Sequence, residues 1–395
     1  MQKQIGAIAL IAGTCIGSGM IALPLILAKL ALLPSILLML FVWALMYFSA
    51  LISLELHIKA KGLPIGQLGS YFNSNLARIS GTISLKLLHF ALVAVYIYAG
   101  SSVLQKLSGT SMEVNFIAIL TATGALVTLL LPMKILDFFN RILCILFLSV
   151  FGILLATLLF KIDFGNLPLL NESYNNISSF PAIIPVLFTS FGFQGSMHTI
   201  VNYCNLESKT LKKAVFIGTL IPTLVYIIWV VCTLGILHSH SPEFYAKIIH
   251  SNVEVGDLVA ELAHISNAKF TQLIVYWISF LAIITSLIGV SRGLADSISA
   301  EFKSFSENSR KFCGAVLAII PSLIVALLVP NAFISILGFA GMILTIIAIM
   351  IPTYLFSKLE SKDIHYNILN NKIIVWVCAI FGALIILCEL STIVN

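Results

Sequence analysis

The chain alternates between long apolar segments and short polar connections along nearly its whole length. A membrane-spanning helix needs about 20 mostly apolar residues, and eleven segments meet this requirement. The pattern predicts an all-α polytopic membrane protein with eleven transmembrane helices in one membrane transport domain, 1–395. The predicted spans are Ile5–Leu30, Pro34–His57, Ile83–Leu104, Asn115–Leu131, Phe138–Phe160, Phe180–Tyr203, Ala214–Leu237, Phe270–Ser291, Phe312–Val329, Phe333–Phe356 and Lys372–Leu390.

Composition supports this class. Of the 395 residues, 59% are hydrophobic and 10% are charged, whereas soluble domains carry about 25% charged residues. The spans use most of the chain, so no sizeable soluble domain fits beside them. The seven cysteines form no Cys-x-x-Cys motif, so neither a disulfide framework nor a structural metal site is predicted.

The lysines and arginines predict an orientation. With a cytoplasmic amino terminus, 17 of the 22 fall in inside connections and 5 in outside connections. This asymmetry follows the positive-inside rule, and an odd number of spans places the carboxyl terminus outside. The net charge of +6 therefore reflects membrane topology and does not indicate a nucleic-acid partner.

Two connections are longer than turns. Gly62–Ser80, on the inside, contains Gly, Asn and Ser and is expected to hold an interfacial helix. Ser239–Asn267, on the outside, is polar and acidic. From Glu254 onward its apolar residues follow helical spacing, which predicts a helical lid rather than a span.

The first span contains a glycine-rich stretch, Ala12–Pro24, that includes Gly13, Gly17 and Gly19. Glycines this dense disfavour a regular helix, and an opened turn in lipid leaves backbone groups without partners. Such a turn persists where it lines a polar cavity and meets a ligand. We therefore expect a broken helix whose amides receive a small anionic group.

The sixth span repeats this pattern. Thr14-x-x-Gly17 has a counterpart in Thr189-x-x-Gly192, and each is followed by another glycine. Because five spans separate the two motifs, the two halves enter the membrane from opposite sides. This predicts inverted repeats over 5–161 (spans one to five) and 180–357 (spans six to ten), with 372–390 as an added helix.

The two breaks supply candidate binding residues. At the first, Gly17, Ser18 and Gly19 would present N–H groups to a carboxylate at the positive end of a half-helix; the alternative is close helix packing by small residues. At the second, an aromatic-rich turn would surround a flat apolar side chain, although each phenylalanine could equally belong to the core. The residues of that turn are Phe188, Ser190, Phe191, Gly192, Phe193 and Gln194.

Further candidates lie in other spans. Tyr96, in mid-span, needs a partner for its hydroxyl and could orient the substrate carboxylate or brace the broken helix; the alternative is a tyrosine bonded to a backbone carbonyl. Ala282, Thr285 and Ser286 lie on one helical face. With the carbonyls of Gly13 and Ile16, they could form an oxygen nest for a sodium ion. The alternative is that both hydroxyls bond the preceding helical turn.

Ionisable groups in lipid are functional candidates. His198 follows Gln194 by one helical turn and could relay a proton, although a neutral core histidine is the simpler interpretation. No nucleophile with a paired base, phosphate loop or metal-spaced cluster is present in the sequence, so an enzyme is not predicted. No cofactor is expected apart from a coupling ion.

The sequence resembles the bacterial aromatic amino acid permeases, the tyrosine- and tryptophan-specific group, and looks closest to the tyrosine permeases. The likeness covers nearly the whole chain in order. It rests on Ala12-Gly-Thr-Cys-Ile-Gly-Ser-Gly-Met-Ile-Ala-Leu-Pro, Phe139-Asn-Arg, Phe188-Thr-Ser-Phe-Gly-Phe-Gln-Gly-Ser, Ile217-Gly-Thr-Leu-Ile-Pro, Thr285-Ser-Leu-Ile-Gly-Val, Gly293-Leu-Ala-Asp and Ala340-Gly…Ile351-Pro.

The resemblance implies a leucine-transporter-like fold in the bacterial inner membrane, with import of an aromatic amino acid by proton symport. It implies that Thr14–Gly19, Cys15 included, holds the backbone groups of the amino acid and that Phe188–Gln194 surrounds its ring. Asp296 and Glu55 match acidic positions of the family.

The sequence departs from this family at three positions. Gln194 stands where enterobacterial members carry histidine, and His198 where they carry proline. Arg292 replaces a small apolar residue near the cytoplasmic exit. These differences affect the predicted ring pocket and the coupling.

The resulting hypothesis is a secondary active transporter for an aromatic amino acid, with tyrosine as the first candidate. It would work by alternating access and be driven by H⁺ or possibly Na⁺, with the choice of ion and the oligomeric state left open. An alternative within this class is a sodium-coupled or broader neutral amino acid carrier. An alternative of another class is a channel or a nutrient receptor on a transporter scaffold, although no charged pore ring is visible.

Overall fold

A computed structural model of the chain describes residues 2–17, 19–109, 112–170, 179–251, 253–265, 269–302, 304–329, 333–360 and 364–394. Over these residues the protein is helical and contains no strand. The α-helices are α1 (Gln2–Cys15), α2 (Gly19–Leu27), α3 (Leu32–Lys59), α4 (Ile65–Tyr71), α5 (Asn75–Ser108), α6 (Val114–Leu130), α7 (Met133–Leu159), α8 (Phe180–Ser190), α9 (Met197–Tyr203), α10 (Ser208–His240), α11 (Pro242–His250), α12 (Val255–Ile265), α13 (Lys269–Ser299), α14 (Glu307–Leu328), α15 (Phe333–Thr345), α16 (Ile351–Phe356) and α17 (Lys372–Val394).

Eight helical segments are long and apolar enough to cross a membrane, and the bent pair α1–α2 makes a ninth. Two more apolar helices are shorter: α6, and the Ile145–Leu159 part of α7. Every predicted span coincides with one of these segments. The predicted helices in the two long connections are present as α4 on one side and as α11 and α12 on the other.

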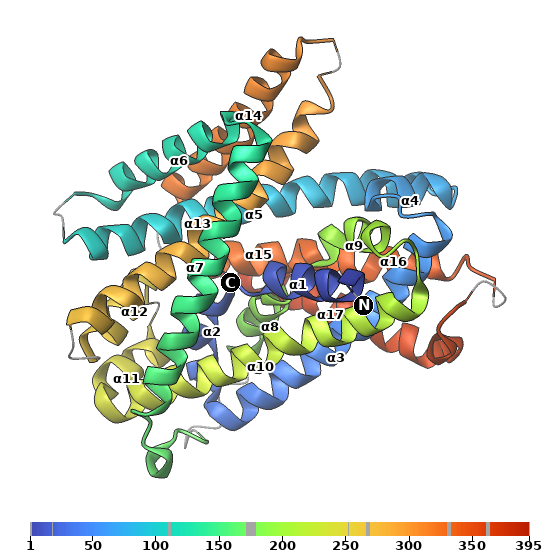
Figure 1. Cartoon of the computed structure of the whole chain (residues 1–395). Helices are drawn as coiled ribbons and strands as arrows, with labels where there is room; N and C mark the ends of the chain where they lie inside the picture. Colours follow the sequence, from blue (N-terminus) through green and yellow to red (C-terminus); the bar gives the residue numbers. More distant parts are fainter. Residues whose placement is uncertain are drawn as a thin grey trace.

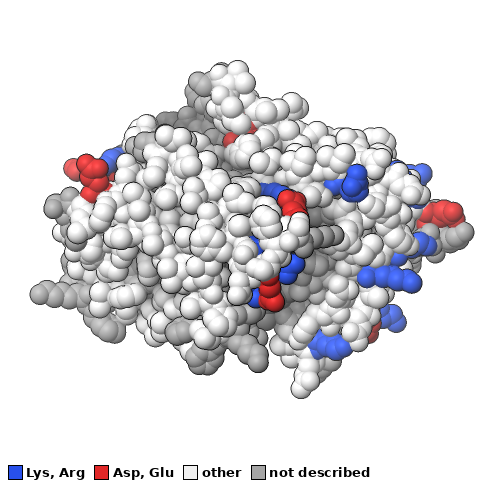
Figure 2. Space-filling model, turned by 90° about the horizontal axis from the view of Figure 1, so that it is seen from above, with Lys and Arg blue, Asp and Glu red and all other residues white. Residues whose placement is uncertain are grey.

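The helices pack around two long elements (Figure 1). α10 runs alongside α3 and carries α1 on another face, whereas α5 packs against α13, α14 and α15. The visible face in Figure 2 is largely uncharged. Its Lys and Arg side chains gather mainly toward the end where Figure 1 places α4 and α9. This distribution is typical of a bundle whose middle lies in lipid.

Two prolines in apolar helices each leave a carbonyl without its helical donor, because proline has no N–H. Pro24 in α2 cannot donate to Met20 O, and the indole Nε1–H of Trp229 donates to that oxygen instead, at 2.8 Å. Pro352 in α16 cannot donate to Ala348 O, and the Ser49 hydroxyl takes its place. Side chains from neighbouring helices therefore complete the backbone hydrogen bonding.

A π-helical turn, η5 (Ile346–Met350), joins α15 to α16 immediately before Pro352. The N–H of Ile351 donates to Ile346 O, five residues back. This wider turn accommodates the proline without ending the span.

Candidate functional site

The first predicted break is present. α1 ends at Cys15, α2 begins at Gly19, and the two half-helices are bent by 51°. Gly17, within the break, lies so close to α13 that a Cβ on it would be 2.6 Å from Ser286 Oγ. Ser18 lies outside the described residues. The first break therefore faces α13, which carries the predicted hydroxyl pair.

The second predicted break is present as well. α8 ends at Ser190, and α9 begins at Met197 after a 3₁₀ turn, η4 (Gln194–Ser196). Gly192 packs against α15, where an added Cβ would be 2.8 Å from Leu344 Cδ2. The α-helix is therefore interrupted in both regions where the sequence predicted it, by a 51° bend in the first and by a turn and a 3₁₀ segment in the second.

The two breaks are in direct contact. A Cβ on Gly19, at the start of α2, would lie 2.9 Å from Ser190 Oγ at the end of α8. The Cys15 thiol lies 3.6 Å from Phe191 O, within its hydrogen-bonding range. Glycine at position 19 is what allows this close approach, because a side chain there would collide with α8.

Tyr226 of α10 bridges the breaks. Its hydroxyl oxygen lies 2.5 Å from Cys15 O and 2.8 Å from Ser190 O, the carbonyls of the last residues of α1 and α8. A phenol has one proton for these two acceptors. Tyr226 therefore serves carbonyls that the two breaks leave without helical donors.

Sequence reasoning did not single out Tyr226 or Trp229. Both are buried in α10, three residues apart, and both serve the broken elements. The available signal was a Tyr and a Trp one helical turn apart in an apolar span, since each carries a polar group that needs a partner in lipid.

The predicted aromatic residues gather beside this bridge. Phe188, Phe191 and Phe193 are buried, and the ring of Phe191 meets that of Tyr226 edge to face, with centroids 5.4 Å apart. Gln194 is also buried, but its side chain turns toward α3, where Nε2 lies 3.4 Å from the Met46 sulfur.

Three further predicted residues have defined partners or positions. Tyr96 lies in α5 and is buried. The hydroxyl of Thr14 donates to Leu10 O within α1, at 2.7 Å. Gly13 faces open space, with nothing within 4 Å of an added Cβ.

In this structure the two hydroxyls of the predicted ion site form hydrogen bonds within their own helix, α13. The hydroxyl of Thr285 donates to Leu281 O at 2.8 Å, and that of Ser286 donates to Ala282 O at 2.9 Å. This is the alternative arrangement, in which hydroxyls bond the preceding turn. Ile16, whose carbonyl was the other expected ligand, lies between the half-helices of the first break.

Glu55 holds a loop. Its carboxylate is fully buried and accepts hydrogen bonds from the N–H of His365 at 3.1 Å and of Tyr366 at 2.7 Å. The Tyr366 hydroxyl in turn donates to Ser208 O, at the start of α10. Burial raises the pKa of Tyr366. Glu55 thus joins the connection after α16 to α3, and Tyr366 joins the same connection to α10.

The two remaining coupling candidates have local partners. Asp296 Oδ2 accepts from Arg292 Nε at 3.0 Å, and Arg292 Nη1 donates to Leu129 O of α6 at 3.2 Å. His198, in α9, is half-buried, with Nε2 at 3.2 Å from Thr199 Oγ1. The departure at Arg292 therefore adds an ion pair to Asp296 and links α13 to α6.

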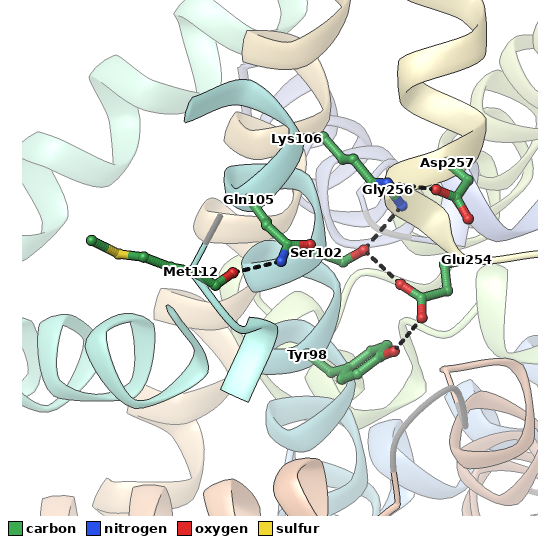
Figure 3. A network of polar contacts seen from close by, with 8 residues as sticks. All are labelled: Tyr98, Ser102, Gln105, Lys106, Met112, Glu254, Gly256 and Asp257. Carbon is green, nitrogen blue, oxygen red and sulfur yellow. Dashed lines mark hydrogen bonds and ion pairs between the residues drawn. The ribbon is translucent and has the colours of Figure 1, made fainter. Parts of the chain in front are cut away.

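The predicted lid, α12, is fastened to α5 (Figure 3). The Glu254 carboxylate accepts from the hydroxyls of Tyr98 at 3.1 Å and Ser102 at 3.2 Å, and Lys106 pairs with Asp257 at 2.8 Å. The three α5 residues recur every four positions and so share one helical face. In this structure α12, the helix predicted to be a lid, lies against that face.

The lid approaches α5 most closely at Gly256. Its N–H donates to Ser102 Oγ at 3.3 Å, and a Cβ there would lie 2.8 Å from the Ser102 carbonyl oxygen. Because the colliding atom is backbone, it could not rotate away, and a side chain at position 256 would lift the lid.

Nine helical segments that are long and apolar enough to cross a membrane define, over the described residues, a multi-pass membrane protein. The chain belongs to the tryptophan/tyrosine permease family, whose model it matches over residues 1–389. Its relatives are permeases and transport proteins rather than enzymes.

Two relatives illustrate the range of this family. The chain is 31% identical over 391 residues to tyrosine-specific transport system 1 of Haemophilus influenzae, covering 98% of this chain and 96% of that protein. It is 28% identical over 408 residues to the low affinity tryptophan permease of Escherichia coli, covering 98% of this chain and 94% of that protein.

Proposed function

We propose that this protein is a secondary active transporter that imports an aromatic amino acid, with tyrosine as the first candidate. The observation that carries the proposal is the contact between the two breaks, Gly19 against Ser190, bridged by Tyr226. Two opened helices that share one polar bridge form a solute site whose halves can separate. The relatives named for tyrosine and for tryptophan support the aromatic class.

The proposed binding mode uses both breaks. The carboxylate of the substrate lies on the amides at the start of α2, beside Gly17 and Ser286, where the helix end is positive. The ring of the substrate packs against the aromatic turn at Phe191. Gly17 is compatible with this mode because it has no side chain to collide with Ser286, whose Oγ would lie 2.6 Å from a Cβ at position 17.

The proposed fold is the leucine-transporter-like inverted repeat with eleven spans. The nine candidate spans and the two shorter apolar helices, α6 and the end of α7, add up to this number. The repeats are 5–161 and 180–357, with 372–390 added. The breaks support this because they interrupt the first span of each repeat.

The proposed setting is the bacterial inner membrane, with a cytoplasmic amino terminus and an outside carboxyl terminus. Proton coupling is the first candidate and sodium coupling the second. Among the titratable candidates, Glu55 and Asp296 already serve structural contacts, and His198 lies just beyond the second break.

Uptake by the purified protein in liposomes tests the proposal. An inward pH step without sodium is expected to drive accumulation of labelled tyrosine, with tryptophan and phenylalanine competing better than leucine. Accumulation driven only by a sodium step at fixed pH would show that the coupling ion is sodium and not the proton. Binding without counterflow would instead indicate a receptor, and the transport proposal would fail.

A further inference from the structure

A cavity of about 510 Å³ lies between α5, α8, α14, α15 and α17, and none of its lining residues belongs to either break. Most of its lining is apolar, with Phe90, Val325 and Phe339 on different helices. Its volume falls within the range of about 300–1,000 Å³ that is usual for small-molecule sites.

One lining residue is a carboxylate. Glu389 of α17 is 3% exposed, and its carboxylate occupies the space that a side chain at position 338 would fill. A Cβ on Gly338 would lie 2.5 Å from Glu389 Oε2. Among the residues that the structure describes, no ion pair includes Glu389. The Thr392 side chain hydrogen-bonds Glu389, but a carboxylate within a span is costly without a cationic partner.

We propose that this cavity binds a small hydrophobic organic ammonium ion, such as an arylalkylamine, with its ammonium group on Glu389 and its apolar body against Phe90 and Phe339. A buried carboxyl group without a cationic partner favours a ligand that brings one, because the pair is more stable than the carboxylate alone. The apolar walls favour a hydrocarbon body, and the volume admits one ring with a short chain.

The same lining disfavours the amino acids that the relatives transport. The described lining residues include no Lys, Arg or His, so the carboxylate of a zwitterion would be buried here without a partner. The cavity should therefore distinguish an amine from the matching amino acid. This inference concerns binding alone and does not depend on the proposed transport function.

Binding of 2-phenylethylammonium to the purified full-length protein tests the inference. The protein is held in nanodiscs of phosphatidylcholine and phosphatidylglycerol, and heat of binding is measured. Glu389→Gln is expected to weaken binding by at least about tenfold, because a charge-assisted contact is lost. Glu113→Gln, which alters an exposed carboxylate before α6, serves as the matched control and should bind like the parent.

Two further arms complete the test. Gly338→Ala, which displaces the carboxylate, should also weaken binding, and 2-phenylethanol and phenylalanine should bind far more weakly than the amine. Unchanged affinity in Glu389→Gln, with an unaltered elution profile, would overturn the proposal. Loss of amine binding when phosphatidylethanolamine replaces phosphatidylcholine would also overturn it, by showing that a lipid headgroup fills the cavity.

Discussion

The hydroxyl of Tyr226 lies 2.5 Å from the carbonyl oxygen of Cys15, the last residue of α1. The same hydroxyl reaches the last carbonyl of α8, at Ser190. One phenol thus joins the ends of two half-helices that are 175 positions apart in sequence, counted from residue 15 to residue 190. Any movement that separates the breaks must release at least one of these contacts.

Replacing Tyr226 by Phe should destabilise the protein. It removes the one proton that the two buried carbonyls share, and an unsatisfied buried group costs about 1–3 kcal/mol. We expect a lower unfolding temperature in detergent and reduced tyrosine uptake. Tyr245→Phe is a matched control, because the buried Tyr245 hydroxyl has no hydrogen-bond partner among the described residues, and burial raises its pKa to about 12. Equal stability losses in the two variants would contradict the bridging role.

Gly17→Leu should abolish uptake while the protein still folds, because the side chain would fill the space beside Ser286. Gly17→Ala should reduce uptake, and adding Ser286→Gly should restore part of it, because the two positions share one space. Gly13→Ala is the control, since nothing lies within 4 Å of a Cβ there. Normal uptake by Gly17→Leu would rule out this position as the carboxylate site.

Phe191→Ala should reduce the preference for aromatic over aliphatic amino acids. The proposed ring contact is lost, and aromatic contacts contribute about 0.5–1.5 kcal/mol beyond area burial. The measurement is inhibition of tyrosine uptake by tryptophan and by leucine in the same liposomes. If the ratio of the two inhibition constants does not change, Phe191 lies outside the ring site.

Glu254→Ala should loosen the lid. The variant removes both contacts from the hydroxyls of Tyr98 and Ser102, each worth about 1.5–3 kcal/mol when the acceptor is charged. Hydrogen exchange over α12 should become faster, whereas exchange in α10 should not change. Glu243→Ala, in the first turn of α11, serves as the control. Unchanged protection of α12 would mean that apolar packing alone holds the lid.

Glu55→Gln separates a structural role from a coupling role. A glutamine keeps one oxygen acceptor but turns its NH₂ group toward the N–H of either His365 or Tyr366. We expect a stability loss of about 1–3 kcal/mol, the cost of one unsatisfied buried group. The pH dependence of the residual uptake should keep its shape. A shifted pH profile with unchanged stability would instead make Glu55 part of the coupling.

The sequence identified the positions of the breaks better than their partners. Gly17 and Gly192 marked interrupted helices because glycine in a long apolar run is a local signal, readable without knowing the neighbours. The partners were invisible for the opposite reason. Gln194 was predicted within the aromatic turn, and its Oε1 does accept from Phe193 N. Its Nε2, however, also lies against Met46 of α3, a residue that no local pattern connects to it.

By itself, then, the sequence determined the class of protein, the order of its apolar helices, the two interruptions and the helical lid, because hydrophobic length and glycine content act over one or two helical turns. Only the tertiary structure decided how the opened backbone is satisfied. Tyr226 donates to the carbonyl of Cys15, and Trp229 donates to the carbonyl of Met20. Each of these carbonyls lies more than 200 positions earlier in the chain. Such contacts depend on how whole helices pack, because a polar group in lipid is satisfied by whichever donor the packing brings to it.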